Sequence, residues 1–113
     1  MPAMTTELPA PVRAALDAAN AGDVDAFLTC FLQDGMVDDW GRHFRGHEAI
    51  RRWSDREFIG VHVSLDVTDV ATHHTHAGEV TVLVQVGGDG FNGPSHFTFR
   101  TDGDQVERMT IRA

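Results

Sequence analysis

The amino-acid sequence predicts an α+β domain, with most helices in its N-terminal half and most strands in its C-terminal half. Two observations carry this prediction. Apolar residues recur at helical spacing in three segments before residue 60. From Val61 onward, apolar and polar residues alternate with a period of two, which is typical of half-buried strands. The expected element order is ααββαββββ.

Two predicted helices begin the domain. Pro9 and Pro11 suit the first turn of a helix, and Gly22 suits its end. Asp23 is a good N-cap for a second helix, which we expect to run as far as Gly35. The apolar faces consist of Val12, Leu16 and Ala19 in the first helix, and of Val24, Phe27, Leu28 and Phe31 in the second.

A short hairpin and a third helix follow. Residues 36–40 and 43–45 predict two strands joined by a turn at Gly41 and Arg42. The third helix is expected over residues 47–59. Its inner side carries Ile50, Trp53 and Phe58.

Four strands complete the chain. The alternation that starts at Val61 changes parity at Val70, which predicts a bulge near Asp69. Residues 80–86 are apolar on both faces, so this strand is expected to be central or covered by a second subunit. A wide glycine-rich loop, a candidate lid, leads to a last hairpin over residues 95–112.

Charge and composition exclude several kinds of function. The length of 113 residues fits one domain. The net charge of −8 argues against nucleic acid or a membrane surface as partner. All nine Lys and Arg positions are Arg, so Schiff-base chemistry has no lysine to use. Cys30 is the only cysteine, which excludes an internal disulfide. We expect a flexible tail over residues 1–8, a single domain over 9–113 and a cytoplasmic location.

Three stretches lie within residues 19–35, 37–50 and 95–111, and contain Ala-Asn-Ala-Gly-Asp, Val-Asp-Asp-Trp and Ser-His-Phe-Thr-Phe. Taken in order, they resemble the nuclear-transport-factor-2-like superfamily in its SnoaL-like and ketosteroid-isomerase-like branch. The resemblance implies a cone-shaped, cystatin-like roll, with three N-terminal helices packed on a curved, mixed and mostly antiparallel sheet. It also implies a pocket for a small apolar molecule, no cofactor, and a homodimer formed through the outer face of the sheet.

The resemblance places Asp39 where ketosteroid isomerases hold the carboxylate that moves a proton. Asp38 and Asp39 are neighbours on a predicted strand, so they point to opposite faces and cannot form a facing carboxylate pair. We expect Asp39 to enter the pocket as a general acid/base, with His43 across the hairpin turn as its partner in a proton relay. Two alternatives stay open: Asp39 bound to an Arg or to the turn at Gly41, and His43 hydrogen-bonded at the rim.

Two positions depart from the ketosteroid isomerase pattern. Ala15 occupies the position where those enzymes have a tyrosine, and Ser95 the position where they have a protonated carboxylic acid. The tyrosine and the carboxylic acid hold the oxyanion in those enzymes. Each such donor is worth about 3 kcal/mol, so we expect no efficient ketosteroid isomerase activity. The predicted ligand-binding residues are Trp40, Phe44, Trp53, Phe58, Val82, Val84, Ser95, Phe97 and Met109.

Three histidines, His73, His74 and His76, stand close together in a predicted hairpin turn. No patterned carboxylate lies near them in the sequence, and a metal site needs ligands that are held rigidly. We therefore expect a solvated turn and no bound metal.

Two classes of function stay open at this point. The first is a SnoaL-like isomerase or cyclase that uses the pocket Asp on a small apolar carbonyl compound. The second is a non-catalytic module of the same fold, which binds a small molecule or acts as a dimeric scaffold. A pocket carboxylate without a partner would favour the enzyme, and the missing oxyanion donors favour the binding module. The limonene-epoxide hydrolase branch uses an Asp-Arg-Asp set with Tyr and Asn, which the sequence does not place.

Overall fold

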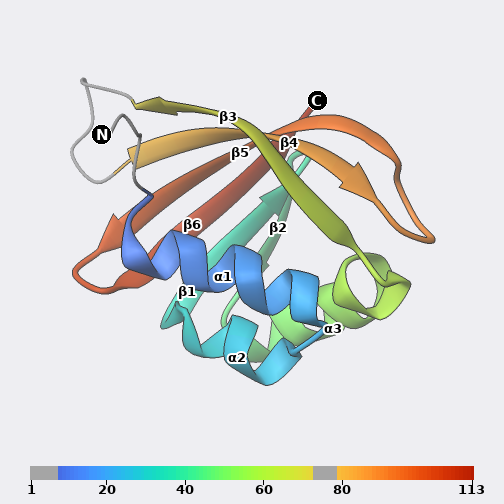
Figure 1. The fold of residues 1–113 in the computed structure, drawn as a ribbon. Coiled ribbons are helices and arrows are strands. Elements are labelled where there is room, and N and C mark those ends of the chain that lie inside the picture. The colour runs from blue at the N-terminus through green and yellow to red at the C-terminus, as the bar shows by residue number, and fades with distance from the viewer. Residues whose placement is uncertain (1–7, 73–78) are drawn as a thin grey trace.

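Three helices lie against one face of a curved six-stranded sheet (Figure 1). The computed structural model describes residues 8–72 and 79–113. The helices are α1 (Ala10–Ala21), α2 (Val24–Thr29) and α3 (His47–Glu57), and a 3₁₀ turn, η1, covers Ile59–Val61. The strands are β1 (Phe31–Asp39), β2 (Arg42–Arg45), β3 (Ser64–Thr72), β4 (Glu79–Gly87), β5 (Gly93–Asp102) and β6 (Gln105–Arg112). This order confirms the predicted α+β class and the predicted succession of elements.

The sheet is mixed and mostly antiparallel, as predicted. Its strand order is β2-β1-β6-β5-β4-β3, and among the strands of the described residues only β1 and β6 pair in parallel. This parallel pairing brings Asp39, at the end of β1, opposite Ile111 of β6. The register between β3 and β4 shifts between Val67 and Asp69, which confirms the predicted bulge.

The second helix is shorter than predicted, because β1 takes over its last residues. α2 ends at Thr29, and Phe31 already pairs with Val106 of β6. The backbone N–H of Val106 donates to the carbonyl oxygen of Cys30 at 2.7 Å. Gly35, predicted to close the helix, lies inside β1, where a Cβ would come within 3.2 Å of the Val106 carbonyl oxygen. Long-range strand pairing therefore overrides the helical spacing of this segment.

The third helix and the strand after it also begin and end differently from the prediction. α3 stops at Glu57, and the segment that begins the alternating pattern at Val61 forms η1 rather than a strand. His62 then adopts a left-handed φ of 57°, and β3 starts at Ser64. The turn directs both Val61 and Val63 toward the cavity described below.

The hydrophobic core fills the space between the helices and the concave face of the sheet. The four valines of β4, Val80, Val82, Val84 and Val86, are buried on this face, whereas Leu83 is half-buried on the outer face. The largest fully buried side chains are Trp53, Phe27, Phe31, Phe97 and Phe99.

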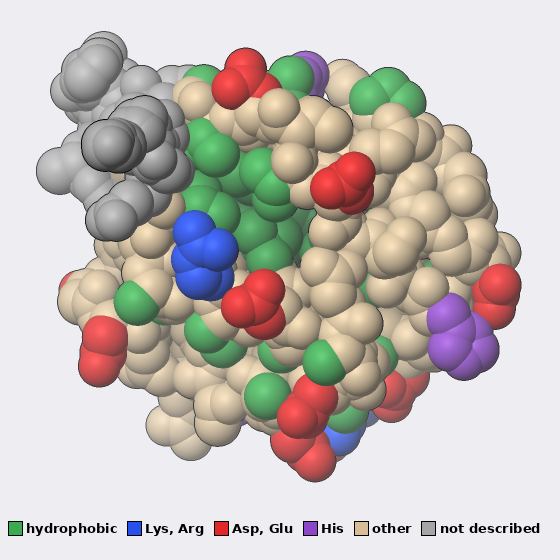
Figure 2. Space-filling model, viewed as in Figure 1, with side chains coloured by type: hydrophobic (Ala, Val, Ile, Leu, Met, Phe, Trp, Pro, Cys, Tyr) green, Lys and Arg blue, Asp and Glu red, His purple; other side chains and the backbone are tan. Residues whose placement is uncertain are grey.

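A hollow floored by hydrophobic side chains lies where α1 faces β3 (Figure 2). This α1–β3 hollow has a volume of about 260 Å³. Its lining residues are Leu8, Arg13, Leu16, Asp17, Asn20, Leu65, Val67 and Val70. Within the described residues, no helix is both long enough and apolar enough to cross a membrane.

Candidate functional site

A cavity of about 370 Å³, called the pocket below, opens beside α3, the end of β1 and the loop between β4 and β5. Its volume lies in the range of small-molecule sites. Most of its wall is apolar, and four charged side chains border it. The lining residues are Asp39, Trp40, Arg42, Trp53, Arg56, Glu57, Phe58, Val61, Val63, Val86, Gly87, Gly90, Phe91, Ser95, Phe97 and Ile111.

The aromatic rings of Trp53, Phe58 and Phe97 form one wall of the pocket. Trp53 of α3 stacks on Phe58 at a ring-centroid distance of 4.8 Å, and Phe58 lies 6.2 Å from Phe97 of β5. Phe44 of β2 stacks behind Trp53 at 6.0 Å. These contacts fix the indole ring of Trp53, so its N–H has a defined direction at the pocket edge.

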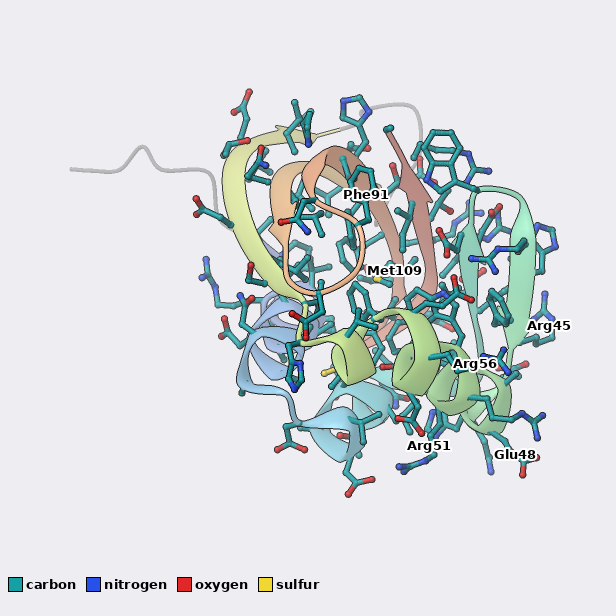
Figure 3. The ribbon with its side chains drawn as sticks, turned by 90° about the vertical axis from the view of Figure 1, so that its right-hand side faces the viewer. Arg45, Glu48, Arg51, Arg56, Phe91 and Met109 are labelled. Atoms are coloured by element: carbon teal, nitrogen blue, oxygen red, sulfur yellow. The ribbon has the colours of Figure 1, made fainter. Side chains whose placement is uncertain are left out.

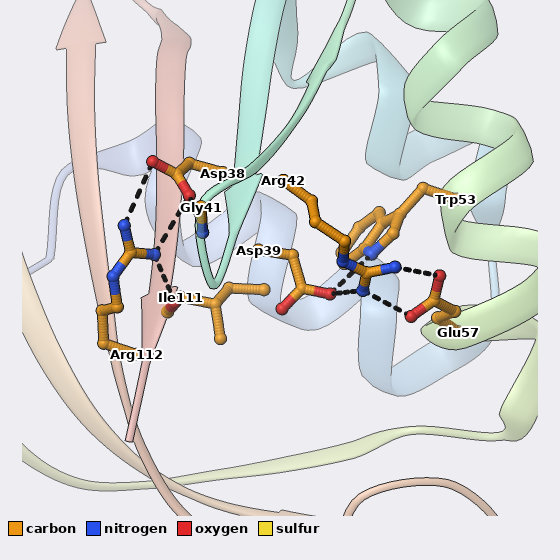
Figure 4. A network of polar contacts seen from close by, with 8 residues as sticks. All are labelled: Asp38, Asp39, Gly41, Arg42, Trp53, Glu57, Ile111 and Arg112. Carbon is orange, nitrogen blue, oxygen red and sulfur yellow. Dashed lines mark hydrogen bonds and ion pairs between the residues drawn. The ribbon is translucent and has the colours of Figure 1, made fainter.

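The indole N–H of Trp53 and the guanidinium of Arg42 hold one oxygen of Asp39 (Figure 4). Trp53 Nε1 donates to Asp39 Oδ2 at 3.1 Å, and Arg42 Nη2 donates to the same oxygen at 2.6 Å. Asp39 Oδ1 has no hydrogen-bond partner within residues 8–72 and 79–113. Asp39 therefore does bind an arginine, as in one of the alternatives left open above, and its carboxylate is oriented through Oδ2 while Oδ1 stays available.

Arg42 also joins the β1–β2 hairpin to α3 through Glu57. Arg42 Nη1 and Nη2 donate to the two Glu57 carboxylate oxygens at 2.9 and 2.6 Å, and its guanidinium lies 5.5 Å from the centre of the Phe44 ring. The hydrogen bond from Arg42 lowers the pKa of Glu57, while Glu57 and then Asp39 raise the pKa of Arg42. The result is a carboxylate–arginine–carboxylate set, Asp39–Arg42–Glu57, at the pocket edge.

Asp38 belongs to the other face of the sheet. Its carboxylate accepts two hydrogen bonds from Arg112, at 3.0 and 3.2 Å, and one from the backbone N–H of Gly41 at 2.8 Å (Figure 4). The hydrogen bonds from Arg112 hold the pKa of Asp38 below its usual value, against the opposing effect of burial. The turn at Gly41 is thus bound by Asp38 rather than by Asp39.

His43 also lies on the outer face, which corrects the predicted relay with Asp39. In the hairpin register Asp39 pairs with Arg42, and His43 pairs with Asp38. His43 Nε2 lies 3.3 Å from Asp38 Oδ2. Because paired residues of an antiparallel hairpin share a face, His43 and Asp39 point to opposite sides of the sheet.

Two exposed aromatic residues stand at the mouth of the pocket. Trp40 follows β1 with a left-handed φ of 55° and has 59% of its surface exposed, and Phe91 has 57%. Phe91 belongs to the glycine-rich loop that joins β4 to β5 (Figure 3). That loop is fastened to η1: the backbone N–H of Asp89 donates to the Val61 carbonyl oxygen at 2.8 Å, and the Asp89 carboxylate pairs with His62 at 2.7 Å.

The structure separates the predicted ligand-binding residues into two groups. Trp40, Trp53, Phe58, Ser95 and Phe97 line the pocket together with Asp39. The hydroxyl of Ser95, a residue with only 5% of its surface exposed, has no hydrogen-bond partner in the described part of the chain. The residues that do not line it are Phe44, Val82, Val84 and Met109, which pack in or against the core behind the wall.

The lining residues that the sequence analysis did not predict include three charged side chains and one aromatic ring, those of Arg42, Arg56, Glu57 and Phe91. One signal was present for Glu57, which follows Trp53 by four residues and so shares its side of the helix. The predicted histidine turn, residues 73, 74 and 76, lies outside the described residues. In the ranges that the structure does describe, no three His, Cys, Asp or Glu side chains gather as metal ligands would.

Solved structures with the same fold come from several bacteria. A proposed polyketide cyclase from Sinorhizobium meliloti is 23% identical, with a TM-score of 0.78 over 93% of this chain and 95% of that one. A protein from Catenulispora acidiphila with a ketosteroid-isomerase-like fold, bound to trimethylamine, is 23% identical, with a TM-score of 0.77 over 95% and 87%. A Mycobacterium tuberculosis protein in complex with estradiol-17beta-hemisuccinate is 15% identical, with a TM-score of 0.76 over 93% of each chain.

The family is shown by a match to a family profile, whereas the solved structures show the fold. No curated protein matches the chain. The profile of the SnoaL-like domain matches residues 12–109, which covers every helix and strand at least in part. The chain therefore belongs to the SnoaL-like domain family and has its ketosteroid-isomerase-like fold.

Proposed function

We propose that this protein is a cofactor-independent enzyme that moves a proton next to a carbonyl group of a small apolar compound, giving isomerisation or ring closure. One observation carries the proposal: Asp39 Oδ2 is held by two donors, while Oδ1 is unpartnered, within the described residues, at the edge of an apolar pocket. A general base needs this combination of fixed orientation and a free acceptor atom.

The proposed step uses two groups of the pocket. Asp39 Oδ1 takes a proton from the carbon next to the substrate carbonyl, and the electron pair of that C–H bond moves to form an enolate. The Ser95 hydroxyl donates a hydrogen bond to the developing oxyanion. In a β,γ-unsaturated carbonyl compound, protonated Asp39 then returns the proton to the γ-carbon of the dienolate, which completes an isomerisation. In a dicarbonyl compound the enolate attacks the second carbonyl, and protonated Asp39 gives its proton to the resulting alkoxide, which completes ring closure.

The surroundings of Asp39 suit a modest rather than a very fast catalyst. A neutral hydroxyl is a weaker oxyanion donor than the tyrosine and carboxylic acid that Ala15 and Ser95 replace. Ala15 is buried in α1 and does not line the pocket. Two structural relatives support flat carbonyl compounds as the substrate class to test first. One is a proposed polyketide cyclase, and the other was solved with a bound steroid derivative.

Deuterium exchange into 2-tetralone, followed by NMR in D₂O, tests the proposal without knowledge of the natural substrate. We expect the protein to accelerate exchange at the carbon next to the carbonyl, and Asp39→Asn to lower the protein-dependent rate by at least about 100-fold. Ser95→Ala should lower it by about tenfold. Asp55→Asn, the same charge change at an exposed position of α3 outside the pocket, is the control and should exchange like wild type.

The same experiment separates the enzyme from a binding module. Quenching of the fluorescence of Trp40 and Trp53, which both line the pocket, reports whether 2-tetralone enters it. Entry without any protein-dependent exchange would contradict the enzyme and leave a small-molecule-binding protein. A homodimer through the outer face of the sheet, and a cytoplasmic location, stay predictions in either case.

A second candidate activity is the addition of water to an epoxide. The Asp39–Arg42–Glu57 set has the carboxylate–arginine–carboxylate composition that the limonene-epoxide hydrolase branch uses, and the sequence alone did not show it. The chain has no tyrosine to hold the water. Hydrolysis of limonene oxide that is lost in Asp39→Asn, with no tetralone exchange in wild type, would favour this candidate over the first.

A further inference from the structure

The four charged residues that line the pocket are two acids and two arginines, but only three of them are bonded to one another. Arg42 lies between Asp39 and Glu57, with 2.6 Å from its Nη2 to each carboxylate. Those three side chains form a closed network. Arg56, the fourth, makes no hydrogen bond or ion pair with any residue in the described ranges.

Arg56 stands near the end of α3, the helix that packs against both strands of the β1–β2 hairpin (Figure 3). Its charge reaches the pocket edge, because after the hydrogen bond and the charge of Arg42 it also contributes to the lowered pKa of Glu57. The side chain is exposed, so it can turn its guanidinium toward a bound molecule without breaking an existing contact.

The negative net charge of the protein disfavours the binding of anions. The net charge is −8, so an anionic molecule gains nothing from the overall field of the protein. Asp39, Arg42 and Glu57 together carry a net charge of −1, so Arg56 is the one cationic group of the described pocket lining that has no hydrogen-bond partner and can bind a negative group. Guanidinium groups bind carboxylate, sulfonate and phosphate oxygens through two parallel hydrogen bonds.

We propose that the ligand of the pocket is an amphipathic acid, whose apolar body lies against Phe58 and Phe97 and whose anionic group binds Arg56 at the rim. This proposal rests on the pocket being the ligand site, as proposed above, but it does not depend on catalysis. Because the ion pair forms at a partly exposed rim, it should raise affinity about three- to tenfold.

Two fluorescent probes with the same ring system test the proposal. 1-Anilinonaphthalene-8-sulfonate carries an anionic group, and N-phenyl-1-naphthylamine lacks it. We expect one site per chain for each probe in buffer of about 0.15 M salt, which screens distant surface charges. Arg56→Gln should weaken sulfonate binding about three- to tenfold while leaving the neutral probe unchanged. Arg56→Lys keeps the charge and should retain part of the sulfonate affinity.

Two matched variants serve as controls. Arg52→Gln removes an exposed arginine one helical turn earlier, outside the pocket lining, and Arg13→Gln removes the arginine of the α1–β3 hollow. Both should bind the two probes like wild type. Equal loss of sulfonate binding in Arg52→Gln or Arg13→Gln, or an unchanged affinity in Arg56→Gln, would overturn the proposal. Failure of the neutral probe to bind would instead contradict the pocket as a ligand site.

Discussion

Replacing Asp38 by Asn should destabilise the protein strongly, although the change removes a single charge and keeps the shape of the side chain. Only 11% of the Asp38 side chain is exposed, and its carboxylate accepts two hydrogen bonds from Arg112. A hydrogen bond to a charged group contributes about 1.5–3 kcal/mol, and breaking a buried ion pair costs about 3–5 kcal/mol.

The lower part of these ranges applies to Asp38. The Arg112 side chain is 42% exposed, so water can hydrate it once its partner is lost, and the new amide oxygen can still accept from the Gly41 N–H. We therefore expect a loss of about 2–3 kcal/mol in the free energy of unfolding. For a chain of this size that corresponds to a melting temperature lower by about 8–12 °C.

The loss should depend on pH in one direction. Because Arg112 lowers the pKa of Asp38 in the folded state, its contribution to stability is complete above the unfolded-state pKa, about 3.9. The contribution disappears as pH falls through the lower folded-state pKa. Urea unfolding of wild type and Asp38→Asn at about pH 7 and in a series below about pH 4 measures both effects. Asp66→Asn, an exposed position on β3, is the control, and equal stability of the Asp38→Asn and Asp66→Asn variants at neutral pH would refute the reasoning.

Two further predictions concern packing and assembly. Gly60→Ala should lower the free energy of unfolding in urea by at least about 3 kcal/mol, because a Cβ there would clash with the Asp55 carbonyl oxygen. Gly22→Ala should lower it by about 1 kcal/mol, because the added Cβ has nothing within 4 Å and the only cost comes from the φ of 73°. Similar losses in the two variants would contradict the close approach of η1 to α3. Light scattering at micromolar concentration should give twice the chain mass of 12.4 kDa, and Leu83→Glu on the outer face should give the monomer; a monomer mass for wild type would exclude the predicted dimer.

The elements that sequence analysis predicted correctly are those specified by nearby residues. Gly22 ends α1 with a φ of 73°, and the parity change at Val70 marks the bulge in β3. The second helix was predicted too long because Phe31 suits a helix face equally well until β6, far along the chain, pairs with it. Local spacing carries no information about such a partner.

The candidate site shows the same distinction between features set by nearby residues and features set by distant ones. Alternation along β1 was enough to predict that Asp38 and Asp39 face opposite sides. The same alternation decides the side of His43, because a two-residue turn at Gly41 and Arg42, as predicted, or at Trp40 and Gly41, as observed, puts His43 on the face of Asp38. The link from Arg42 to Glu57 joins the start of β2 to the end of α3, and a sequence pattern cannot give the distance between two such elements.

The contacts of Asp39 also change what its replacement can prove. Loss of stability in Asp39→Asn would at first suggest a purely structural carboxylate. In this structure Trp53 and Arg42 both donate to Oδ2, so some destabilisation is expected whether or not Oδ1 accepts a proton from a substrate. A catalytic triad shows the same principle, because the group that orients a base is itself bonded to it. A change in the free energy of unfolding therefore reports the hydrogen bonds to Oδ2. Only the deuterium-exchange assay reports whether Oδ1 accepts a proton from a substrate.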